Sequence, residues 1–203
     1  MGKTLPTARI FTHLFGLLPA ALYSFWFFSG RLGVNPVQSI QQASGQWALN
    51  FLLLSLACTP IAIVTGNKKV LSRRQALGNY GYFYATSHFL IFIGVDYQFN
   101  LNWILADVGT KMYILIGLSA LLLLSPLAVT SLVWFKKRMG KNWKKLHLLA
   151  YLIPAIVIWH YFAASKGNLF TLQGNITKPL VYLAVYAALL IIRLPIFRRF
   201  FNR

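Results

Sequence analysis

Six long apolar runs, separated by short connections, constrain this chain more than any other feature of its sequence. The runs cover approximately residues 10–28, 47–64, 77–95, 112–135, 146–164 and 180–197. A helix needs about 20 apolar residues to cross a hydrocarbon core of about 30 Å, and these runs approach that length. Because lipid cannot satisfy free backbone polar groups, each run is expected to be helical. The sequence therefore predicts an all-α, polytopic membrane helix bundle with six transmembrane helices.

The distribution of charge predicts how these helices are oriented. The chain has 20 Lys and Arg residues against two acids, Asp96 and Asp107. Sixteen of the basic residues fall at the termini and in the second and fourth connections, whereas four share the other side with both acids: Arg31, Lys111, Lys166 and Lys178. The sixteen are Lys3, Arg9, Lys68, Lys69, Arg73, Arg74, Lys136, Lys137, Arg138, Lys141, Lys144, Lys145, Arg193, Arg198, Arg199 and Arg203. Since Lys and Arg concentrate on the cytoplasmic side, both termini are expected in the cytoplasm.

The net charge of +18 could also indicate a nucleic-acid partner. However, the basic residues lie between apolar runs rather than on an amphipathic soluble surface, so topology and membrane lipid explain them better. We therefore expect no nucleic-acid partner.

The short connections exclude several function classes. None is long enough for a soluble domain, and the chain has neither a GxGxxG nor a Walker motif, so any reductant must arrive on another protein or through the membrane. No acidic residue lies inside a run, whereas proton-coupled transporters usually need a carboxylate relay. The single Cys58 excludes an intrachain disulfide. Residues 1–203 are interpreted as one transmembrane domain.

Four histidines lie inside or at the edges of the runs: His13, His88, His147 and His160. Polar groups in a membrane are costly and usually functional, and a neutral imidazole is a good iron ligand. The alternative for each is an interhelical hydrogen bond, in which case the chain would be a transporter or membrane scaffold without haem.

Depth along the helices places these histidines at two levels. At about 1.5 Å per residue, His88 and His160 lie roughly 16 and 21 Å from the cytoplasmic ends of their runs. His147 and His13 lie near the cytoplasmic edge of theirs. The expected arrangement is an outer pair, His88 with His160, and an inner pair, His147 with His13.

The step from His147 to His160 also separates these two residues. Thirteen residues span about 20 Å and leave about 220° after whole turns, so the two do not share a face of a straight helix. Pro154 between them commonly kinks a helix and changes this phase. The spacing suits two ligands at different depths. Two axial histidines fill both axial positions of a haem iron and favour one-electron transfer, so the predicted function class is non-catalytic electron transfer.

Two basic segments, SRRQALG (72–78) and KKRMGKNWKKLH (136–147), lie on the predicted cytoplasmic side. They are expected either to contact anionic lipid headgroups or to attract haem propionates or an acidic electron donor. The sequence leaves both interpretations open.

Several segments together resemble a known family. They are HLFGLLP (13–19), NPVQSIQQASGQWALNFLLL (35–54), SRRQALG (72–78), ATSHF around His88, MGKNWKKLHLLAYL (139–152) and the HYF after Trp159. In this order, over nearly the whole chain, they resemble the MsrQ (YedZ) family of haem-binding membrane subunits. That family belongs to the ferric reductase and NADPH oxidase transmembrane superfamily.

The resemblance implies that His88, His147 and His160 are axial ligands of one or two b-type haems. Such subunits lie in the bacterial inner membrane and take electrons from the quinone pool or a cytosolic flavin reductase. They pass these electrons to the periplasmic molybdopterin enzyme MsrP, which repairs methionine sulfoxide in periplasmic proteins. The family also implies FMN, although no residue here places it. Another di-haem cytochrome b, such as a ferric reductase or a hydrogenase membrane anchor, is the alternative.

One departure from the superfamily pattern concerns the inner haem. The superfamily has two histidines on each of two helices, whereas Arg74 and Gln75 stand 14 and 13 residues before His88. His147 therefore lacks its expected partner. We predict that His13 supplies the missing ligand, or that the inner haem is weak or absent.

Overall fold

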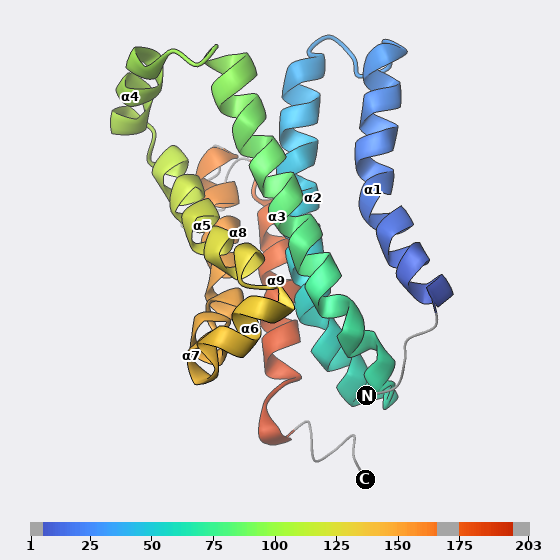
Figure 1. The fold of residues 1–203 in the computed structure, drawn as a ribbon. Coiled ribbons are helices and arrows are strands. Elements are labelled where there is room, and N and C mark those ends of the chain that lie inside the picture. Colours follow the sequence, from blue (N-terminus) through green and yellow to red (C-terminus); the bar gives the residue numbers. More distant parts are fainter. Residues whose placement is uncertain (1–5, 166–174, 197–203) are drawn as a thin grey trace. The chain divides into compact units, whose positions relative to one another are not determined.

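Helices form all the secondary structure in the part of the chain that the computed structural model describes, residues 6–165 and 175–196 (Figure 1). For residues 6–8 only the backbone is described. Some of the residues used in the predictions lie outside these ranges: Lys3, Lys166, Arg198, Arg199, Arg203 and residue 197 at the end of the last run.

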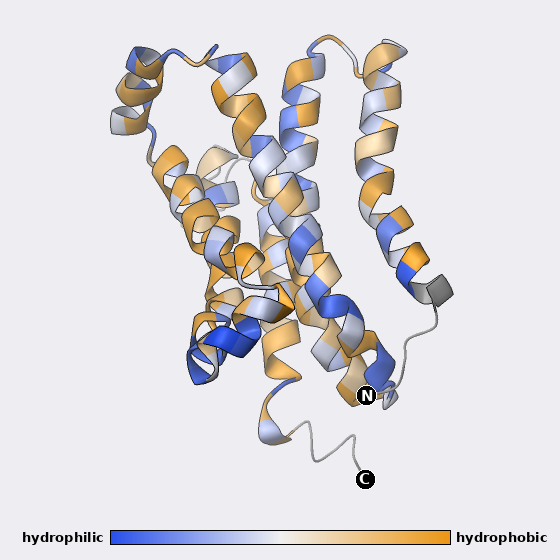
Figure 2. Cartoon of the chain, viewed as in Figure 1, coloured by the Kyte–Doolittle hydropathy of each residue, from blue (hydrophilic) through white to orange (hydrophobic). Residues whose placement is uncertain are grey.

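The described helices include several that are long and apolar enough to cross a membrane. Four meet this test alone: Arg9–Phe28, Pro36–Thr65, Met112–Val129 and Lys141–Ala164. A fifth is added if Lys68–Asp96 and Leu101–Thr110 form one bent span. Thr177–Ile191 is apolar but has only 15 residues. Hydrophobic residues run along these helices (Figure 2). The prediction of an all-helical, multi-pass membrane protein is confirmed, while six spans and cytoplasmic termini remain predictions.

Exposed apolar side chains fit a lipid environment for these helices. Phe11 is 71% exposed, Leu122 63% and Trp159 56%. Water-soluble proteins rarely expose broad apolar surfaces, because the contact of apolar surface with water is unfavourable. The outer faces of these helices are therefore suited to contact acyl chains.

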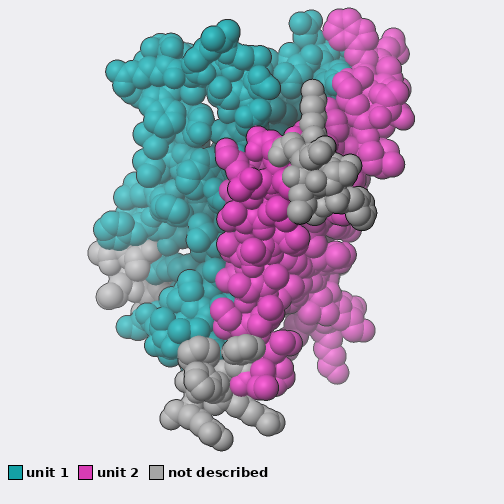
Figure 3. All heavy atoms as spheres, turned by 180° about the vertical axis from the view of Figure 1, so that it is seen from behind, with its two compact units in different colours: residues 1–100 teal, residues 101–203 magenta. Residues whose placement is uncertain are grey.

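The chain divides into two compact units, residues 1–100 and residues 101–203 (Figure 3). The elements of the first unit are α1 (Pro6–Phe28), α2 (Pro36–Thr65), the 3₁₀ helix η1 (Lys68–Arg73), α3 (Arg74–Ile91) and the π-helical turn η2 (Phe92–Asp96). The elements of the second unit are α4 (Leu101–Thr110), α5 (Met112–Val129), α6 (Val133–Met139), α7 (Lys141–Leu146), α8 (Leu149–Ala164) and α9 (Thr177–Ile191).

Local sequence explains where the longest helix begins and ends. The Asn35 side chain caps α2 by accepting a hydrogen bond from the Gln38 amide at 3.0 Å, and Pro36 occupies the first turn, where an N–H is not needed. Gly66 ends α2 with φ of 68°, a left-handed conformation that glycine adopts at little cost.

The core of the first unit forms where α2 packs against α3. The Phe51 ring is fully buried and stacks on Tyr84, with 5.4 Å between centroids and 8° between planes. Gly81 allows the two helices to approach closely, because a Cβ there would lie 2.9 Å from Leu52 Cδ2. This packing holds the two helices that carry the candidate site of the first unit.

Tyr84 also attaches α1 to α3. Its hydroxyl donates to the Gly16 carbonyl at 2.8 Å and accepts from the Ala20 amide at 3.0 Å. Ala20 and Gly16 are the pair that a regular helix would bond directly. Pro19 lies beside them inside α1, and a hydroxyl inserted between such groups is one cause of a helix bend.

Tyr84→Phe is expected to lower the stability of the protein in detergent by about 1–3 kcal/mol, because it removes a buried hydroxyl that bonds both groups. The measurement is the thermal unfolding midpoint followed by helicity. Tyr82→Phe, a partly buried tyrosine on the same helix, is the control. Equal midpoints for the two variants would contradict this role of Tyr84.

The second unit is built around α5 and α8. Ile153 and Ile158 on α8 are almost fully buried, and Leu124 on α5 is 5% exposed. Tyr186 on α9 donates a hydrogen bond to the Tyr151 carbonyl on α8 at 2.7 Å. These contacts hold α8, which carries His160.

The run predicted as one helix over residues 112–135 is interrupted. α5 ends at Val129, and the Thr130 amide bonds the Pro126 carbonyl in its last turn. Leu132 is extended, with ψ of 144°, and α6 starts at Val133. The apolar run was therefore longer than the helix, because backbone geometry rather than hydropathy sets the end.

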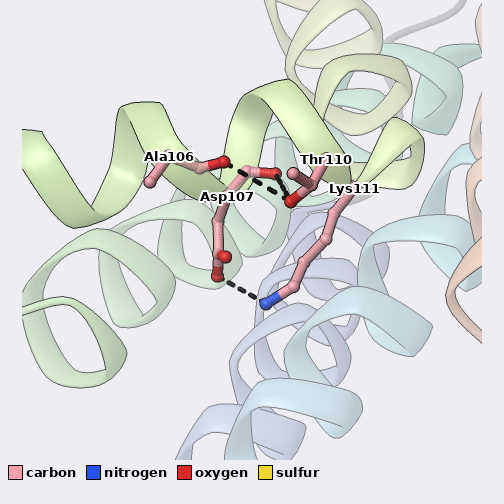
Figure 4. A network of polar contacts seen from close by, with 4 residues as sticks. All are labelled: Ala106, Asp107, Thr110 and Lys111. Atoms are coloured by element: carbon pink, nitrogen blue, oxygen red, sulfur yellow. Dashed lines mark hydrogen bonds and ion pairs between the residues drawn. The ribbon is translucent and has the colours of Figure 1, made fainter.

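α4 and the start of α5 are joined through a small polar network (Figure 4). Asp107 forms an ion pair with Lys111, and the Thr110 hydroxyl donates to the carbonyls of Asp107 and Ala106 at 3.2 and 3.4 Å. An ion pair four residues apart with partly exposed side chains contributes little to stability. Its main effect is local, at the end of α4.

Candidate functional site

His88 on α3 is held by the backbone of α2. Its Nδ1–H donates to the Gln41 carbonyl at 2.9 Å, and the Ser44 hydroxyl oxygen lies 3.4 Å from the same nitrogen. The Ser44 hydroxyl itself donates to the Gln41 carbonyl at 2.9 Å. Because a carbonyl oxygen only accepts, Nδ1 carries the proton of the neutral ring. The basic lone pair of His88 is therefore on Nε2.

His160 on α8 has the same kind of partner in the second unit. Its Nδ1–H donates to the Tyr113 carbonyl at 2.7 Å, near the start of α5. The Tyr113 ring is tilted beside the imidazole, with 6.2 Å between centroids. The lone pair of His160 is likewise on Nε2.

These two histidines fit a haem iron in their donor chemistry. Metal-binding histidines almost always donate their second ring N–H to a carbonyl or carboxylate, which fixes the tautomer and raises the basicity of the ligand. His88 and His160 have this arrangement with main-chain carbonyls. Sequence reasoning identified the histidines but missed Gln41 and Tyr113, because these residues contribute only backbone atoms and no side-chain pattern reveals them.

His147 has different surroundings, although it lies only two residues before α8. Its Nε2 lies 3.2 Å from the Thr130 hydroxyl oxygen, and that hydroxyl donates to the Pro126 carbonyl at 2.6 Å. Since the hydroxyl proton points to Pro126, the His147 Nε2–H is the donor to Thr130. The lone pair of this ring is therefore on Nδ1.

Trp143 supports the same ring from one side. It stacks on His147 with 4.0 Å between centroids and 26° between planes, and its Nε1–H donates to the Thr130 carbonyl at 2.8 Å. Trp143 and Thr130 are functional candidates that the sequence did not single out. The four-residue spacing from Trp143 to His147 on a helical turn was the signal that could have found Trp143.

His13 on α1 contacts α3 within the first unit. Its Nδ1 lies 3.0 Å from the Tyr80 hydroxyl, which also donates to the His13 carbonyl at 3.3 Å. The predicted pairs, His88 with His160 and His147 with His13, each combine residues of the two units and remain predictions.

The basic segment that follows α5 has internal partners for part of its charge. Lys136 Nζ lies 4.9 Å from the centre of the Trp143 ring, and the Arg138 guanidinium lies 5.1 Å from that of Trp134. Lys136, Lys137 and Arg138 also occupy the last turn of α6, where a helix dipole favours cations. These contacts are compatible with both interpretations of the segment, lipid headgroups and anionic partners.

Comparison with known proteins identifies relatives along most of the chain. Residues 43–158 match the family model described as "Ferric reductase like transmembrane component". A protein from Rhodospirillum rubrum named protein-methionine-sulfoxide reductase heme-binding subunit MsrQ is 38% identical over 193 residues, which cover 94% of this chain and 89% of that protein.

Two further relatives carry the same name. The protein from Herminiimonas arsenicoxydans is 35% identical over 87% of this chain and 79% of its own length. The protein from Polaromonas naphthalenivorans is 36% identical over 91% of this chain and 83% of its own length. The similarity to the Rhodospirillum rubrum protein covers enough of this chain to include α2 with α3, which carries His88, and α5 with α8, which carries His160.

Proposed function

The chain belongs to the MsrQ family of ferric reductase-like transmembrane proteins, and on that premise we propose that it is a b-type haem electron-transfer subunit of the bacterial inner membrane. It takes electrons from the quinone pool or a cytosolic flavin reductase and delivers them to the periplasmic reductase MsrP. MsrP uses them to repair methionine sulfoxide in periplasmic proteins. The observation that carries this proposal is the pair of intramembrane histidines whose Nδ1–H groups donate to backbone carbonyls.

The proposed ligands are His88, His160 and His147. A bound haem supplies an iron that accepts and releases one electron at a time, which suits transfer between carriers. His88 and His160 present Nε2, and their carbonyl partners strengthen the donation of that lone pair. His147 is held by Thr130 and Trp143 and presents Nδ1.

The protein's own residues supply the remaining requirements of a conduit. His88 and His160 are partly buried among apolar helices, which limits the access of water. The basic residues of α6 and α7 provide a positive surface that would attract haem propionates or an acidic donor. FMN is a further cofactor implied by the family, and we assign no residue to it.

Electron delivery to purified MsrP tests this function. Protein purified in detergent with haem supplied is reduced by dithionite, and the difference spectrum and haem count are recorded. The reduced protein is then mixed with MsrP and methionine sulfoxide. We expect an α-band typical of b-type haem that disappears as electrons reach MsrP. A haem protein that does not reduce MsrP would instead be another di-haem cytochrome b, and a flat α-band region would indicate a transporter or scaffold.

His13→Ala decides between the two alternatives for the inner haem, a ligand supplied by His13 or a haem that is weak or absent. If the inner haem is weak or absent, this variant leaves haem content and spectrum unchanged and only weakens the contact of α1 with α3 at Tyr80. Haem is quantified per chain after gel filtration, with His147→Ala as the comparison. Equal haem loss in the two variants would instead make His13 a ligand.

A further inference from the structure

The surroundings of His88 and His160 repeat at a constant distance along the chain. In both cases the histidine lies 47 residues after the residue whose carbonyl accepts its Nδ1–H. In both cases a glycine, Gly45 or Gly117, lies four residues after that acceptor. Acceptor, glycine and histidine are each shifted by 72 residues between the units: 41 to 113, 45 to 117 and 88 to 160.

Both glycines contact the imidazole of their own unit. A Cβ on Gly45 would lie 3.2 Å from Cε1 and Nδ1 of His88. A Cβ on Gly117 would lie 2.8 Å from Cε1 and Nδ1 of His160. Contacts of this length are tighter than ordinary van der Waals contact, so any side chain at these positions would push the ring away.

Helix geometry explains why the glycine stands four residues after the acceptor. A helical carbonyl has two lone pairs, and its own helix uses one of them for the amide four residues later. In a helix each Cα–Cβ bond leans toward the N-terminus, so the side chain four residues later covers the turn that contains this carbonyl. Glycine leaves the second lone pair accessible to a donor from a neighbouring helix.

The same shift of 72 residues also relates His147 to Gln75, the residue at the equivalent position of the first unit. His147 lies 13 residues before His160, and Gln75 lies 13 residues before His88, so the two are also 72 residues apart. The repeat therefore extends along both histidine-bearing helices. It differs at the position where the first unit lacks a histidine.

We propose that Gly45 and Gly117 are positioning residues that open the carbonyls of Gln41 and Tyr113 to the histidine rings and thereby direct Nε2 of His88 and His160 toward iron. This proposal rests on the proposed function of both histidines as haem ligands. The carbonyl bond makes the ring a stronger donor, which favours ferric iron. The two glycines thus strengthen haem binding and lower the reduction potential of the haem iron.

The test compares Gly45→Ala and Gly117→Ala with matched glycine variants. Gly78→Ala on α3 and Gly109→Ala on α4 are the controls, because a Cβ at Gly78 meets only Ser55 at 3.4 Å or more and one at Gly109 meets nothing within 4 Å. All four changes raise helix propensity. A loss of haem that occurs in Gly45→Ala and Gly117→Ala but not in the controls is therefore not caused by helix propensity. Haem per chain and the midpoint potential by redox titration are measured after gel filtration.

We expect Gly117→Ala to lose haem or to raise the midpoint potential more than Gly45→Ala, because its added methyl group has less space. The controls should match the wild-type protein. Wild-type haem content and potentials in both Gly45→Ala and Gly117→Ala would overturn the proposal while leaving haem binding intact. Absence of haem from the wild-type protein would instead overturn the proposed function.

A measurement that keeps both glycines applies even if the glycine variants do not fold. Electron–nuclear double resonance on haem-loaded protein with ¹⁵N-labelled histidine detects the proton on the remote ring nitrogen and its replacement in D₂O. We expect an exchangeable proton on Nδ1 of both ligands, with Nε2 bound to iron. His147, which presents Nδ1, is removed from the measurement by using the His147→Ala variant. Iron bound through Nδ1 of His88 or His160, or a remote nitrogen of either ring without a proton, would overturn the proposal.

Discussion

His160→Ala is expected to lower the affinity for the outer haem by at least ~100-fold. Mutating a residue that only hydrogen-bonds a metal ligand already lowers metal affinity by about 10–100-fold, and this variant removes the ligand itself. The ring that this change removes donates to the Tyr113 carbonyl at 2.7 Å and fills the space above Gly117. Alanine supplies neither a ligand nor this packing. His88→Ala removes the corresponding ring on α3 and is expected to have an effect of the same size.

Haem per chain and the reduced-minus-oxidised spectrum measure this effect. Ser165→Ala at the C-terminal end of α8 is the control, since its hydroxyl donates to the Phe162 carbonyl of the same helix. If His88 and His160 share one iron, as their predicted depths indicate, the double variant should lose no more haem than either single variant. Full haem retention in His160→Ala would exclude it as a ligand.

A double-mutant cycle links this prediction to the glycine proposal. Once His160 is alanine, the methyl group of Gly117→Ala no longer meets a ring, so the added effect of the second change should vanish. Coupling between the two positions is expected because a Cβ at position 117 would lie 2.8 Å from the His160 ring. Simple additivity of the two changes would contradict an effect of Gly117 through the histidine.

His147→Ala is expected to remove the haem signal that His147 supports, and Thr130→Val to weaken haem binding there by about tenfold. The Thr130 hydroxyl accepts from Nε2 of His147 and fixes its orientation, and valine keeps the shape but not the acceptor. The ring can then keep its stacking on Trp143 while a half-turn exchanges the positions of its two nitrogens, so the nitrogen that faces iron is no longer fixed.

Haem titration of the two variants against Thr110→Val tests this role. Thr110 is a suitable control because its hydroxyl, like that of Thr130, bonds the carbonyl four residues earlier in its own helix. Wild-type affinity in Thr130→Val would show that the hydroxyl does not orient the ligand. Wild-type haem content in His147→Ala would remove His147 from the ligands.

Much of the fold was predictable because lipid imposes simple rules on sequence. Apolar runs of about 20 residues must be helices, so α1, α2, α3, α5 and α8 overlap the predicted runs, although α2 begins at Pro36, well before the run that starts at residue 47. Helix ends were less predictable. The run over residues 112–135 breaks near Thr130, where local backbone bonds rather than hydropathy end the helix.

The candidate site was predictable to the extent that it consists of side chains with unusual chemistry. Histidines are conspicuous in apolar runs, so His88, His147 and His160 could be chosen from the sequence. Their partners could not, because the carbonyls of Gln41 and Tyr113 belong to residues whose side chains take no part. The hydroxyl of Thr130 gave no distinct signal, because threonine is common in membrane helices, whereas Trp143 could have been found from its four-residue spacing to His147.

The sequence by itself determined that this protein is a helical membrane protein with intramembrane histidines, because hydropathy and rare ionisable residues act over short stretches of chain. Only the tertiary structure decided which nitrogen of each ring carries its lone pair. That choice depends on atoms 47 residues away for His88 and His160, and 17 residues away for His147. Hydrogen bonds between helices set it, and no local pattern in the sequence encodes them.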